Sequence, residues 1–357
     1  MSASSFVYLA HPARVVFGAG SLQQLSAEVD RLGAKRALVL CTPGQAETGA
    51  RVAALLGARA AGVFAKAAMH VPIESARAAR DEARRLGADC AVAIGGGSTT
   101  GLGKAIALDS GLPIIAVPTT YAGSEMTPIY GITEGGLKTT GRDARVLPKC
   151  VIYDPELTLS LPLAITVSSA FNAIAHAAEG LYAPDMNPVI ALMAEEGIRA
   201  SAAALFPLQH DARDVAARSD ALYGAWLCGM VLGATTMGLH HKLCHTLGGS
   251  FNLPHAEVHT VLLPHALAYN AVAAPDGLRR AGRSLGVGAG EVPQGLQALA
   301  KRYGAPTSLA ALGMPADGLN RVADLAVQNQ YANPRPLDHT ALRALLQRAF
   351  DGAVPQA

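Results

Sequence analysis

The chain has 357 residues, of which 50% are hydrophobic and only 16% are charged, so it holds enough apolar material for large cores and, we expect, two domains. The same composition argues against extensive disorder. Twenty-nine basic residues nearly balance 27 acidic residues, and the net charge is only +2. Because the arginines are scattered through helix-like segments and form no stripe, we expect a small-molecule ligand and no nucleic-acid partner.

The cysteines indicate a reducing compartment. Five of them are widely spaced among apolar neighbours: Cys41, Cys90, Cys150, Cys228 and Cys244. None forms a CxxC pair, which predicts free, buried thiols. The N-terminus lacks a basic segment followed by an apolar one, and the apolar run 225–239 is too short and glycine-rich to span a bilayer. We therefore expect a soluble cytoplasmic protein with no membrane partner.

Six short runs rich in valine and isoleucine are predicted to be β-strands. They cover residues 13–18, 36–42, 60–65, 89–97, 112–120 and 150–155. Helix-like segments stand between several of them, as at 21–34 and 74–88. This alternation predicts a doubly wound, parallel α/β sheet that binds a dinucleotide, over residues 1–158.

The second part of the chain differs in composition and periodicity. Alanine and leucine dominate, helical periodicities are long, and convincing strand runs are missing. We therefore expect an all-helical substrate or catalytic domain over residues 159–357. The segment 154–166, with two prolines and several Thr and Ser residues, is the best candidate for the hinge.

A glycine-rich turn follows the fourth predicted strand. In AVAIGGGSTTGLGK, Gly95, Gly96 and Gly97 lead through Ser98 into a predicted helix. Glycines there let the backbone approach a pyrophosphate, and the N–H groups and dipole at the helix start favour its negative charge. The pattern is neither G-x-G-x-x-G nor a Walker motif, so a tight turn without a ligand stays open as the alternative.

The next predicted strand is also followed by residues that can bind a nucleotide. In IIAVPTTYAGSEMT, the hydroxyl groups of Thr119, Thr120 and Ser124 follow an apolar run, although an ST-turn that serves only its own backbone is the alternative. Two such loops at strand ends favour a nucleotide. The loop after the second strand, residues 41–43, is neutral, and nothing in it would repel a 2′-phosphate. We therefore expect both NADH and NADPH to be accepted.

Two pairs of polar residues stand four apart in helix-like stretches: Asn172 with His176, and His241 with His245. Residues at this spacing share one face of a helix. His255 follows a glycine-rich break and opens another helix, so it can return to the same place. Such a group is typical of a metal site, although each histidine can equally be an ordinary core or surface residue. That ordinary role is assigned to His259 and His265.

Several motifs together resemble those of the iron-containing alcohol dehydrogenase family, which includes dehydroquinate synthase-like relatives. They are GGGST (95–99), PTT (118–120), GSE (123–125), DPELT (154–158), HKLCH (241–245) and LPHAEVHTVLLPH (253–265). Each alone is weak, but together they are specific and span nearly the whole chain. The resemblance implies a dehydroquinate synthase-like architecture, in which a nucleotide-binding α/β domain precedes an all-α domain.

The resemblance also implies site residues. Seven positions match the family's nucleotide contacts: Gly96, Gly97, Ser98, Thr119, Thr120, Ser124 and Lys138. Three histidines match its metal ligands: His176, His245 and His255. The family's fourth ligand is an aspartate, and this chain has Asn172 in its place.

A second departure is Gly101, where the family commonly has aspartate. With Asn172, it resembles the pattern of the maleylacetate reductase branch. That resemblance implies NADH- or NADPH-dependent reduction of the conjugated double bond of maleylacetate, a small dicarboxylate, to 3-oxoadipate. It also implies a homodimer.

No bound metal is expected. Three neutral imidazoles and a neutral amide offset neither charge of a divalent cation, whereas an aspartate would offset one. Metal affinity should therefore fall, although three-histidine zinc sites exist. Conjugate reduction suits such a site, because it spreads charge over an enolate that hydrogen-bond donors can stabilise without a Lewis acid.

Roles follow from these residue types. Three side chains would bind the substrate carboxylates or stabilise the enolate: His241, His245 and His255, with Lys242 as a further candidate. Either His241 or His245 would supply the proton, and Asn172 with His176 would orient the substrate or a water. Arg335 could bind a carboxylate, but its two flanking prolines favour an exposed turn.

Three rival functions stay open. The nearest is a metal-dependent alcohol or polyol dehydrogenase in which Asn172 is the fourth ligand. The second is a dehydroquinate synthase-like lyase that uses NAD transiently. The third, a non-catalytic nucleotide-binding protein, is disfavoured because buried polar groups without a role cost stability.

Overall fold

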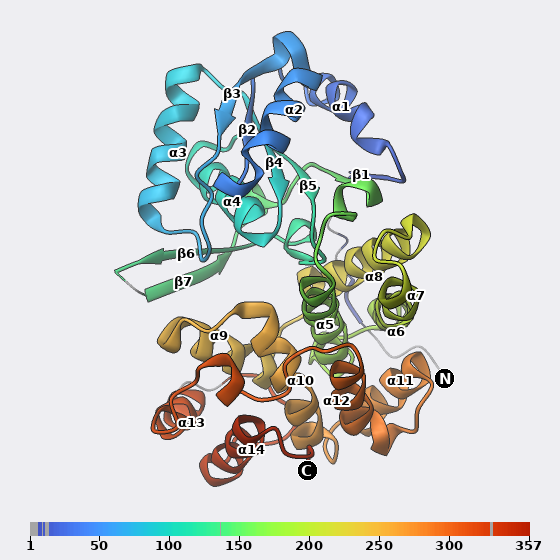
Figure 1. Ribbon diagram of the computed structural model, residues 1–357. Helices are drawn as coiled ribbons and strands as arrows, with labels where there is room; N and C mark the ends of the chain where they lie inside the picture. Colours follow the sequence, from blue (N-terminus) through green and yellow to red (C-terminus); the bar gives the residue numbers. More distant parts are fainter. Residues whose placement is uncertain (1–5, 9, 11–13, 136, 329–330) are drawn as a thin grey trace. The chain divides into compact units, whose positions relative to one another are not determined.

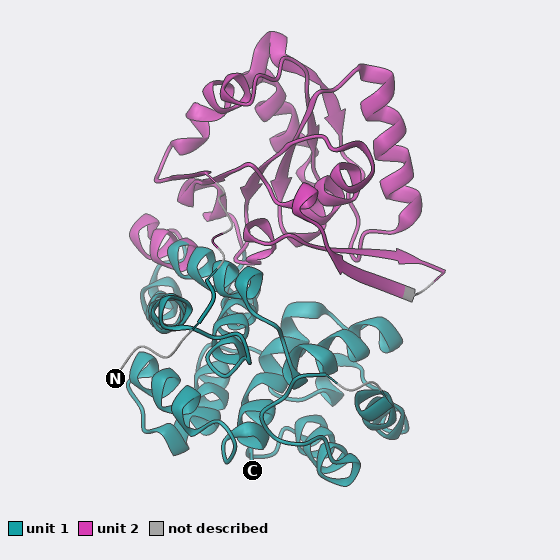
Figure 2. Ribbon diagram, turned by 180° about the vertical axis from the view of Figure 1, so that it is seen from behind, with its two compact units in different colours: residues 1–9, 162–212, 223–357 teal, residues 10–161, 213–222 magenta. Residues whose placement is uncertain are grey.

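The computed structural model describes residues 6–8, 10, 14–135, 137–328 and 331–357. The described chain divides into two compact units, coloured separately in Figure 2. Unit 2 consists of residues 10–161 and 213–222, and unit 1 of the remainder. Each unit is described by itself below.

Unit 2 is built on a parallel sheet of six strands in the order β1-β8-β5-β4-β2-β3. The strands are β1 (Arg14–Phe17), β2 (Ala37–Leu40), β3 (Ala60–Phe64), β4 (Cys90–Gly95), β5 (Ile114–Pro118) and β8 (Cys150–Tyr153). They coincide with the six predicted apolar runs, so the predicted α/β fold class is confirmed.

Helices cover both faces of this sheet (Figure 1). They are α1 (Leu25–Arg31), α2 (Ala46–Leu56), α3 (Ile73–Leu86) and α4 (Gly97–Ser110). Successive strand residues point to opposite faces. On β2, Val39 therefore belongs to the apolar cluster with α1 and α2, whereas Leu38 and Leu40 belong to the cluster with α3 and α4.

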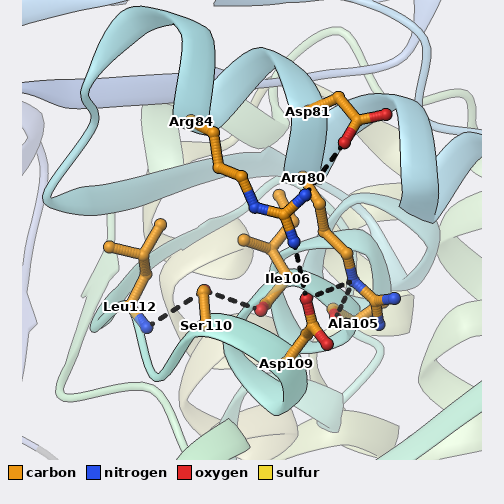
Figure 3. A network of polar contacts seen from close by, with 8 residues as sticks. All are labelled: Arg80, Asp81, Arg84, Ala105, Ile106, Asp109, Ser110 and Leu112. Atoms are coloured by element: carbon orange, nitrogen blue, oxygen red, sulfur yellow. Dashed lines mark hydrogen bonds and ion pairs between the residues drawn. The ribbon is translucent and has the colours of Figure 1, made fainter.

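Polar contacts tie α3 to the second half of α4 (Figure 3). The half-buried guanidinium of Arg80 donates to the carbonyl of Ala105 at 2.7 and 3.1 Å. Arg84 bridges Asp81 at 3.1 Å and Asp109 at 3.2 Å. The exposed ion pairs contribute little, but the Arg80 contact satisfies a backbone carbonyl beside the apolar interface. It helps to fix the direction of the helix that begins at the glycine-rich turn.

An antiparallel hairpin, β6 (Ile129–Glu134) and β7 (Leu137–Arg142), was not predicted. Its residues are mostly half-exposed, so they form no apolar run. The signal that marks it is a turn at Gly135, where φ is +57°, between runs rich in Thr and Ile. β6 packs against α4, and the Thr133 N–H and hydroxyl donate to the carbonyls of Val71 and His70 at 3.0 and 2.8 Å.

Beyond residue 162 the described chain is helical. The helices are α5 (Leu163–Gly180), α6 (Pro188–Ala203), α7 (Leu205–His210), α8 (Val215–Ala234), α9 (Leu239–Phe251), α10 (His255–Asn270), α11 (Pro275–Leu285), α12 (Val292–Arg302), α13 (Gly318–Gln328) and α14 (His339–Asp351). One apolar core joins α9, α10, α13 and α14. The predicted helical second half is confirmed, although the first turns of α8 belong to unit 2.

Two expectations from the sequence concern the cysteines and membrane-spanning helices. The five cysteines are free thiols, and all are buried, as predicted. Among the described residues, no single helix is long and apolar enough to cross a bilayer. Helices α8 and α9 reach the necessary length and apolar composition only when they are taken together, and the chain bends by 97° between them.

Candidate active site

The two predicted nucleotide loops of unit 2 lie side by side. Gly95 and Pro118, the last residues of β4 and β5, are register partners, so the loops after them start together. The Thr119 N–H donates to the carbonyl of Gly95 at 3.0 Å. A Cβ on Gly96 would lie 3.1 Å from the side chain of Thr120. The fold therefore brings these predicted residues into one cluster.

Gly95 needs to be a glycine for two reasons. Its φ is +150°, and a Cβ there would lie 2.5 Å from Thr99 Oγ1 and 2.8 Å from Gln45 Oε1. Helix α4 then begins at Gly97, followed by Ser98, with no acidic residue in its first turn. The Thr99 and Thr100 N–H groups donate to the Gly96 carbonyl, and the start of the helix presents the positive end of its dipole, which makes this turn suited to a phosphate anion.

A buried lysine that the sequence reasoning missed fixes the turn at Ser124. Lys104 Nζ donates to the carbonyls of Ser124 at 2.6 Å, Thr127 at 2.9 Å and Ile129 at 2.7 Å. Burial lowers the pKa of Lys104 to about 7. The available signal was its position: Lys104 lies on α4, seven residues after Gly97, in the helix that starts at the glycine turn.

Lys138 lies on the hairpin, on β7, and not on either loop. Its carbon chain crosses Gly131, where an added Cβ would be 2.8 Å from Lys138 Cε. Burial lowers the pKa of this lysine. Burial also lowers the pKa of His70, and the nearby Lys138 charge lowers it further.

Gly101 has little room for a larger residue unless a neighbouring side chain shifts. A Cβ there would lie 2.7 Å from Cγ2 of Val71. Val71 has φ +51° and His70 has φ +62°, a conformation that is unusual for non-glycine residues and most of all for a β-branched one. This strained loop fills the space where the family pattern places an aspartate side chain.

The loop after β2 is neutral, as the sequence indicates, and contributes one residue that was missed. Gln45 Nε2 donates to Thr119 Oγ1 at 3.1 Å, and the Thr42 hydroxyl donates to Gln45 Oε1 at 3.2 Å. Gln45 therefore links this loop to the predicted nucleotide cluster.

Unit 1 gathers the predicted histidines from three helices. Asn172 and His176 are buried on α5. His241 is buried on α9, four residues before the exposed His245, and His255 is the half-buried first residue of α10. The His176 ring stacks on that of His241, with centroids 5.1 Å apart, and the His245 ring stacks on that of His255 at 6.3 Å. His241 and His245 join the two pairs at 6.2 Å.

Two more histidines belong to this cluster. His240 and His259 are completely buried, and His240 Nε2 lies 2.9 Å from His259 Nδ1. The His259 ring also contacts those of His176, His241 and His255, with centroids 6.0, 5.0 and 4.5 Å away. His259 is thus a core residue, as assigned from the sequence, but it lies at the centre of the cluster. His265 is buried elsewhere on α10.

A buried glutamate completes the cluster and was missed by the sequence reasoning. Glu179 on α5 accepts hydrogen bonds from the backbone N–H groups of His240 at 2.8 Å and His241 at 3.3 Å. Its Oε2 also lies 2.5 Å from His241 Nδ1. The signal was local, since positions 172, 176 and 179 share one face of a helix.

Burial shifts the pKa values of the residues in this cluster. It lowers the pKa of His240 to about 3, and it lowers the pKa values of His176 and His259 strongly; neighbouring imidazoles lower all three further. These histidines are neutral at pH 7. Burial would raise the pKa of Glu179, but the hydrogen bond and charge of His241 outweigh it, and the net shift is downward. Glu179 is therefore ionised.

The donors at the implied metal position suit a divalent iron or zinc ion poorly. They are a carboxamide and three imidazoles: Asn172, His176, His245 and His255. The carboxylate that the fold brings to the cluster, Glu179, is already engaged by the start of α9 and by His241. No anionic donor therefore balances the charge of the ion at these positions.

A second donor group is His240, Cys244 and His259, whose ligand atoms lie within 4.8 Å of one another. Two nitrogen ligands of a tetrahedral zinc, each at about 2.0–2.1 Å, would be about 3.3–3.4 Å apart. The observed 2.9 Å between His240 and His259 is a hydrogen bond. Burial raises the pKa of the Cys244 thiol well above its usual value, which disfavours the thiolate that a metal needs.

Arg335 is occupied by other contacts. Its guanidinium donates to the Tyr269 carbonyl at 3.0 Å and lies 4.2 Å from the centroid of the Tyr269 ring. These contacts anchor the turn after residue 331 to the end of α10. They give Arg335 a structural role within unit 1.

Known proteins resemble this chain over nearly its whole length. Residues 12–155 match the family described as iron-containing alcohol dehydrogenase, and residues 166–350 match the C-terminal part of the Fe-containing alcohol dehydrogenase family. A maleylacetate reductase of Burkholderia cepacia is 68% identical over 352 residues, which are 99% of each chain. One of Sphingobium indicum is 56% identical over 350 residues, 98% of this chain and 99% of that protein.

A solved structure is similar to the same extent. The crystal structure of maleylacetate reductase from Agrobacterium tumefaciens has a TM-score of 0.94 and 56% sequence identity. The match covers 99% of this chain and 100% of that chain.

Proposed function

Because the chain belongs to the iron-containing alcohol dehydrogenase family, we propose that it catalyses the NAD(P)H-dependent reduction of maleylacetate to 3-oxoadipate, a step in the degradation of aromatic compounds. The observation that carries this proposal is the full-length similarity to maleylacetate reductases. The buried histidine cluster with Asn172 supports it, because a site rich in hydrogen-bond donors suits a dianionic substrate.

The dinucleotide is held by the loops of unit 2. Seven residues are proposed to contact it: Gly96, Gly97, Ser98, Thr119, Thr120, Ser124 and Lys138. The glycine turn at the start of α4 would receive the pyrophosphate, and the hydroxyl groups after β5 would bind ribose or phosphate oxygens. The neutral loop around Thr42 and Gln45 supports acceptance of both NADH and NADPH.

When bound, the reduced nicotinamide supplies a hydride to the double-bond carbon farther from the ketone. The π electrons of the substrate move toward the ketone oxygen and form an enolate. His241, His245 and His255, with Lys242 as a further candidate, bind the carboxylates or stabilise this charge. Either His241 or His245 delivers a proton to the carbon beside the ketone, and Asn172 with His176 orients the substrate or a water.

The reaction is proposed to need no metal. The support is the donor set, in which a carboxamide replaces the aspartate and the nearby carboxylate is engaged elsewhere. Metal analysis of the purified protein and activity after chelation test this point. A stoichiometric iron or zinc whose removal abolishes turnover would contradict it and would favour a metal-dependent alcohol or polyol dehydrogenase.

The decisive test of the function follows the absorbance of NADH. Mixing the protein with NADH and maleylacetate should consume one NADH per substrate, with 3-oxoadipate as the product. A lyase that uses NAD transiently would show no net change. Oxidation of NADH only with an aldehyde and added metal would instead favour a metal-dependent alcohol or polyol dehydrogenase.

Two wider properties are proposed as well. A homodimer follows from the family resemblance, and light scattering on the purified protein tests it. A cytoplasmic location is supported by the five free thiols. Fractionation of the producing cells tests the location.

A further inference from the structure

Lys104 is a cation in the interior of unit 2, where it is only 1% exposed. Lysines are almost never buried to this extent unless their donors are matched. Here Nζ donates to three backbone carbonyls, those of Ser124 at 2.6 Å, Thr127 at 2.9 Å and Ile129 at 2.7 Å. An ammonium group has three N–H donors, one for each of these carbonyls. The carbonyls therefore form a site that fits one ammonium group.

All three carbonyls belong to one short segment that leads from the loop after β5 into the hairpin. The segment begins with the 3₁₀ helix η4 (Ser124–Met126) and ends at Ile129, the first residue of β6. Both η4 and β6 pack against α4. Lys104 thus attaches this segment to α4 at its first residue, at its last residue and between them.

This attachment joins three places that are proposed to contact the nucleotide. The first is the glycine turn, because Lys104 lies seven residues after Gly97 on the same face of α4. The second is Ser124, which Lys104 contacts directly. The third is Lys138 on β7, because β7 pairs with the strand that Ile129 opens. One ammonium group therefore fixes the loop and the start of the hairpin relative to the turn.

The contact with the Ser124 side chain also has a direction. Lys104 Nζ lies 3.3 Å from Ser124 Oγ, and an ammonium group can only donate, so the hydroxyl oxygen accepts. The hydroxyl proton is then left for another acceptor, and a phosphate or ribose oxygen is such an acceptor. This contact is longer than those to the carbonyls, so we expect the carbonyls to carry most of the effect.

We infer that Lys104 is a positioning residue for the dinucleotide, which holds Ser124 and the start of the β6–β7 hairpin in the place where they bind NADH. This inference rests on the proposed nucleotide contacts of unit 2. Lys104 is too deeply buried to contact the cofactor itself. It takes no part in hydride or proton transfer. Its loss should therefore weaken cofactor binding much more than the chemical step.

The first test replaces Lys104 by methionine, which keeps most of the apolar chain and removes the three donors. Lys104→Met should raise the Kd for NADH about 30-fold, measured by calorimetric titration. The kcat with maleylacetate at saturating NADH should stay within about threefold of the wild type. A merely structural role gives the opposite result, because fewer folded molecules lower kcat and leave the Kd of the folded ones unchanged.

A milder variant covers the case in which Lys104→Met does not fold. Thr127 is buried, is not a proposed nucleotide contact, and places its hydroxyl oxygen 3.0 Å from Lys104 Nζ. Thr127→Val removes that hydroxyl and keeps the shape of the side chain. It should raise the Kd for NADH about fivefold and leave kcat nearly unchanged.

The matched control is Arg80→Met. Arg80 is another largely buried cation of unit 2 that donates to a backbone carbonyl, that of Ala105 on α4. Its described contacts join α3 to α4 and do not include the segment 124–129. Arg80→Met should lower the melting temperature and leave the Kd for NADH unchanged.

A double-mutant cycle asks whether Lys104 acts through Ser124. The variant that carries both Lys104→Met and Ser124→Ala should raise the Kd for NADH by less than the product of the two single effects. Effects that multiply would show that the two residues act independently and would overturn the inference. An unchanged Kd in Lys104→Met, or in Thr127→Val if the first variant does not fold, would overturn it too. So would an equal rise in Arg80→Met.

Failure of the proposed function is recognised separately. A wild-type protein that binds NADH but does not oxidise it with maleylacetate contradicts the proposed reaction alone, and the Kd values of the variants still decide the role of Lys104. A wild-type protein that does not bind NADH overturns the inference.

Discussion

Unit 2 forms its candidate site from loops, whereas unit 1 forms its site from helices. In unit 2 the cluster consists of glycines and hydroxyl groups whose places follow from the register of β4 and β5. In unit 1 it consists of imidazoles that surround one another and one carboxylate. The first site should therefore be sensitive to backbone shape, and the second to charge. Substitutions at the two sites can test this contrast.

The largest effect is expected from Gly95→Ala. Positive φ and two contacts under 3 Å oppose any Cβ at this position. The turn must shift, and kcat/KM for NADH should fall about 100-fold, equivalent to ~2.7 kcal/mol. Steady-state kinetics with varied NADH measures it.

The control for that variant is Gly111→Ala, at the other end of α4. Gly111 also has positive φ, at +71°, but no atom lies within 4 Å of its added Cβ. It should cost about 1 kcal/mol of stability and leave NADH kinetics unchanged. Equal kinetic losses in both variants would contradict a special role for the glycine turn.

Acid should destabilise unit 1 through its buried histidines. Burial lowers the pKa of His265 to about 4, so between pH 6.5 and 4 the unfolded state binds more protons than the folded state. The free energy of unfolding should fall with pH in this window, by up to about 1.4 kcal/mol per pH unit for each such histidine. Urea unfolding at pH 7 and pH 5 measures the slope.

His265→Phe should reduce this slope, because it removes one of these groups. The exposed His210, replaced by glutamine, is the control and should leave the slope nearly unchanged. A slope that is the same in all three proteins would show that buried imidazoles do not govern acid stability.

A charge placed in the histidine cluster should change its ligand. Asn172→Asp adds one negative charge, which should tighten Zn²⁺ binding at least about tenfold, or ~1.4 kcal/mol. The same charge should repel the dianionic substrate and lower kcat/KM by a similar factor. Calorimetric titration with Zn²⁺ and steady-state kinetics measure the two effects. Asn172→Ala, which changes the side chain without adding charge, should show no tighter binding.

The smallest difference is expected between NADH and NADPH. The neutral loop at Thr42 and Gln45 neither binds a free 2′-hydroxyl through an acid nor repels a 2′-phosphate. Both cofactors should therefore support turnover. A preference above about a hundredfold in kcat/KM, or ~2.7 kcal/mol, would refute this prediction.

The sheet could be read from the sequence because each central strand is buried on both faces. Residues such as Val39 and Leu40 point to opposite sides, and both find apolar neighbours, so the run is continuous. The hairpin β6–β7 escaped for the opposite reason. Its strands are half-exposed and carry polar residues, so only the glycine turn between them marked it.

The histidine cluster could be read only in part. The spacing of His241 and His245 gives a shared helix face, but contacts between α5, α9 and α10 join residues far apart in the sequence. His240 and His259 meet only because α9 and α10 pack together. Glu179 lies three residues after His176, so helix geometry alone could have included it.

The contact between Val71 and Gly101 couples these two positions. An aspartate at position 101 requires the valine side chain to shift or to be replaced, since a Cβ there would lie 2.7 Å from it. Removing the valine first would open a void in an already strained loop. A carboxylate is therefore accommodated best at position 101 together with a smaller residue at position 71, so the two residues form one coupled unit of this loop and helix.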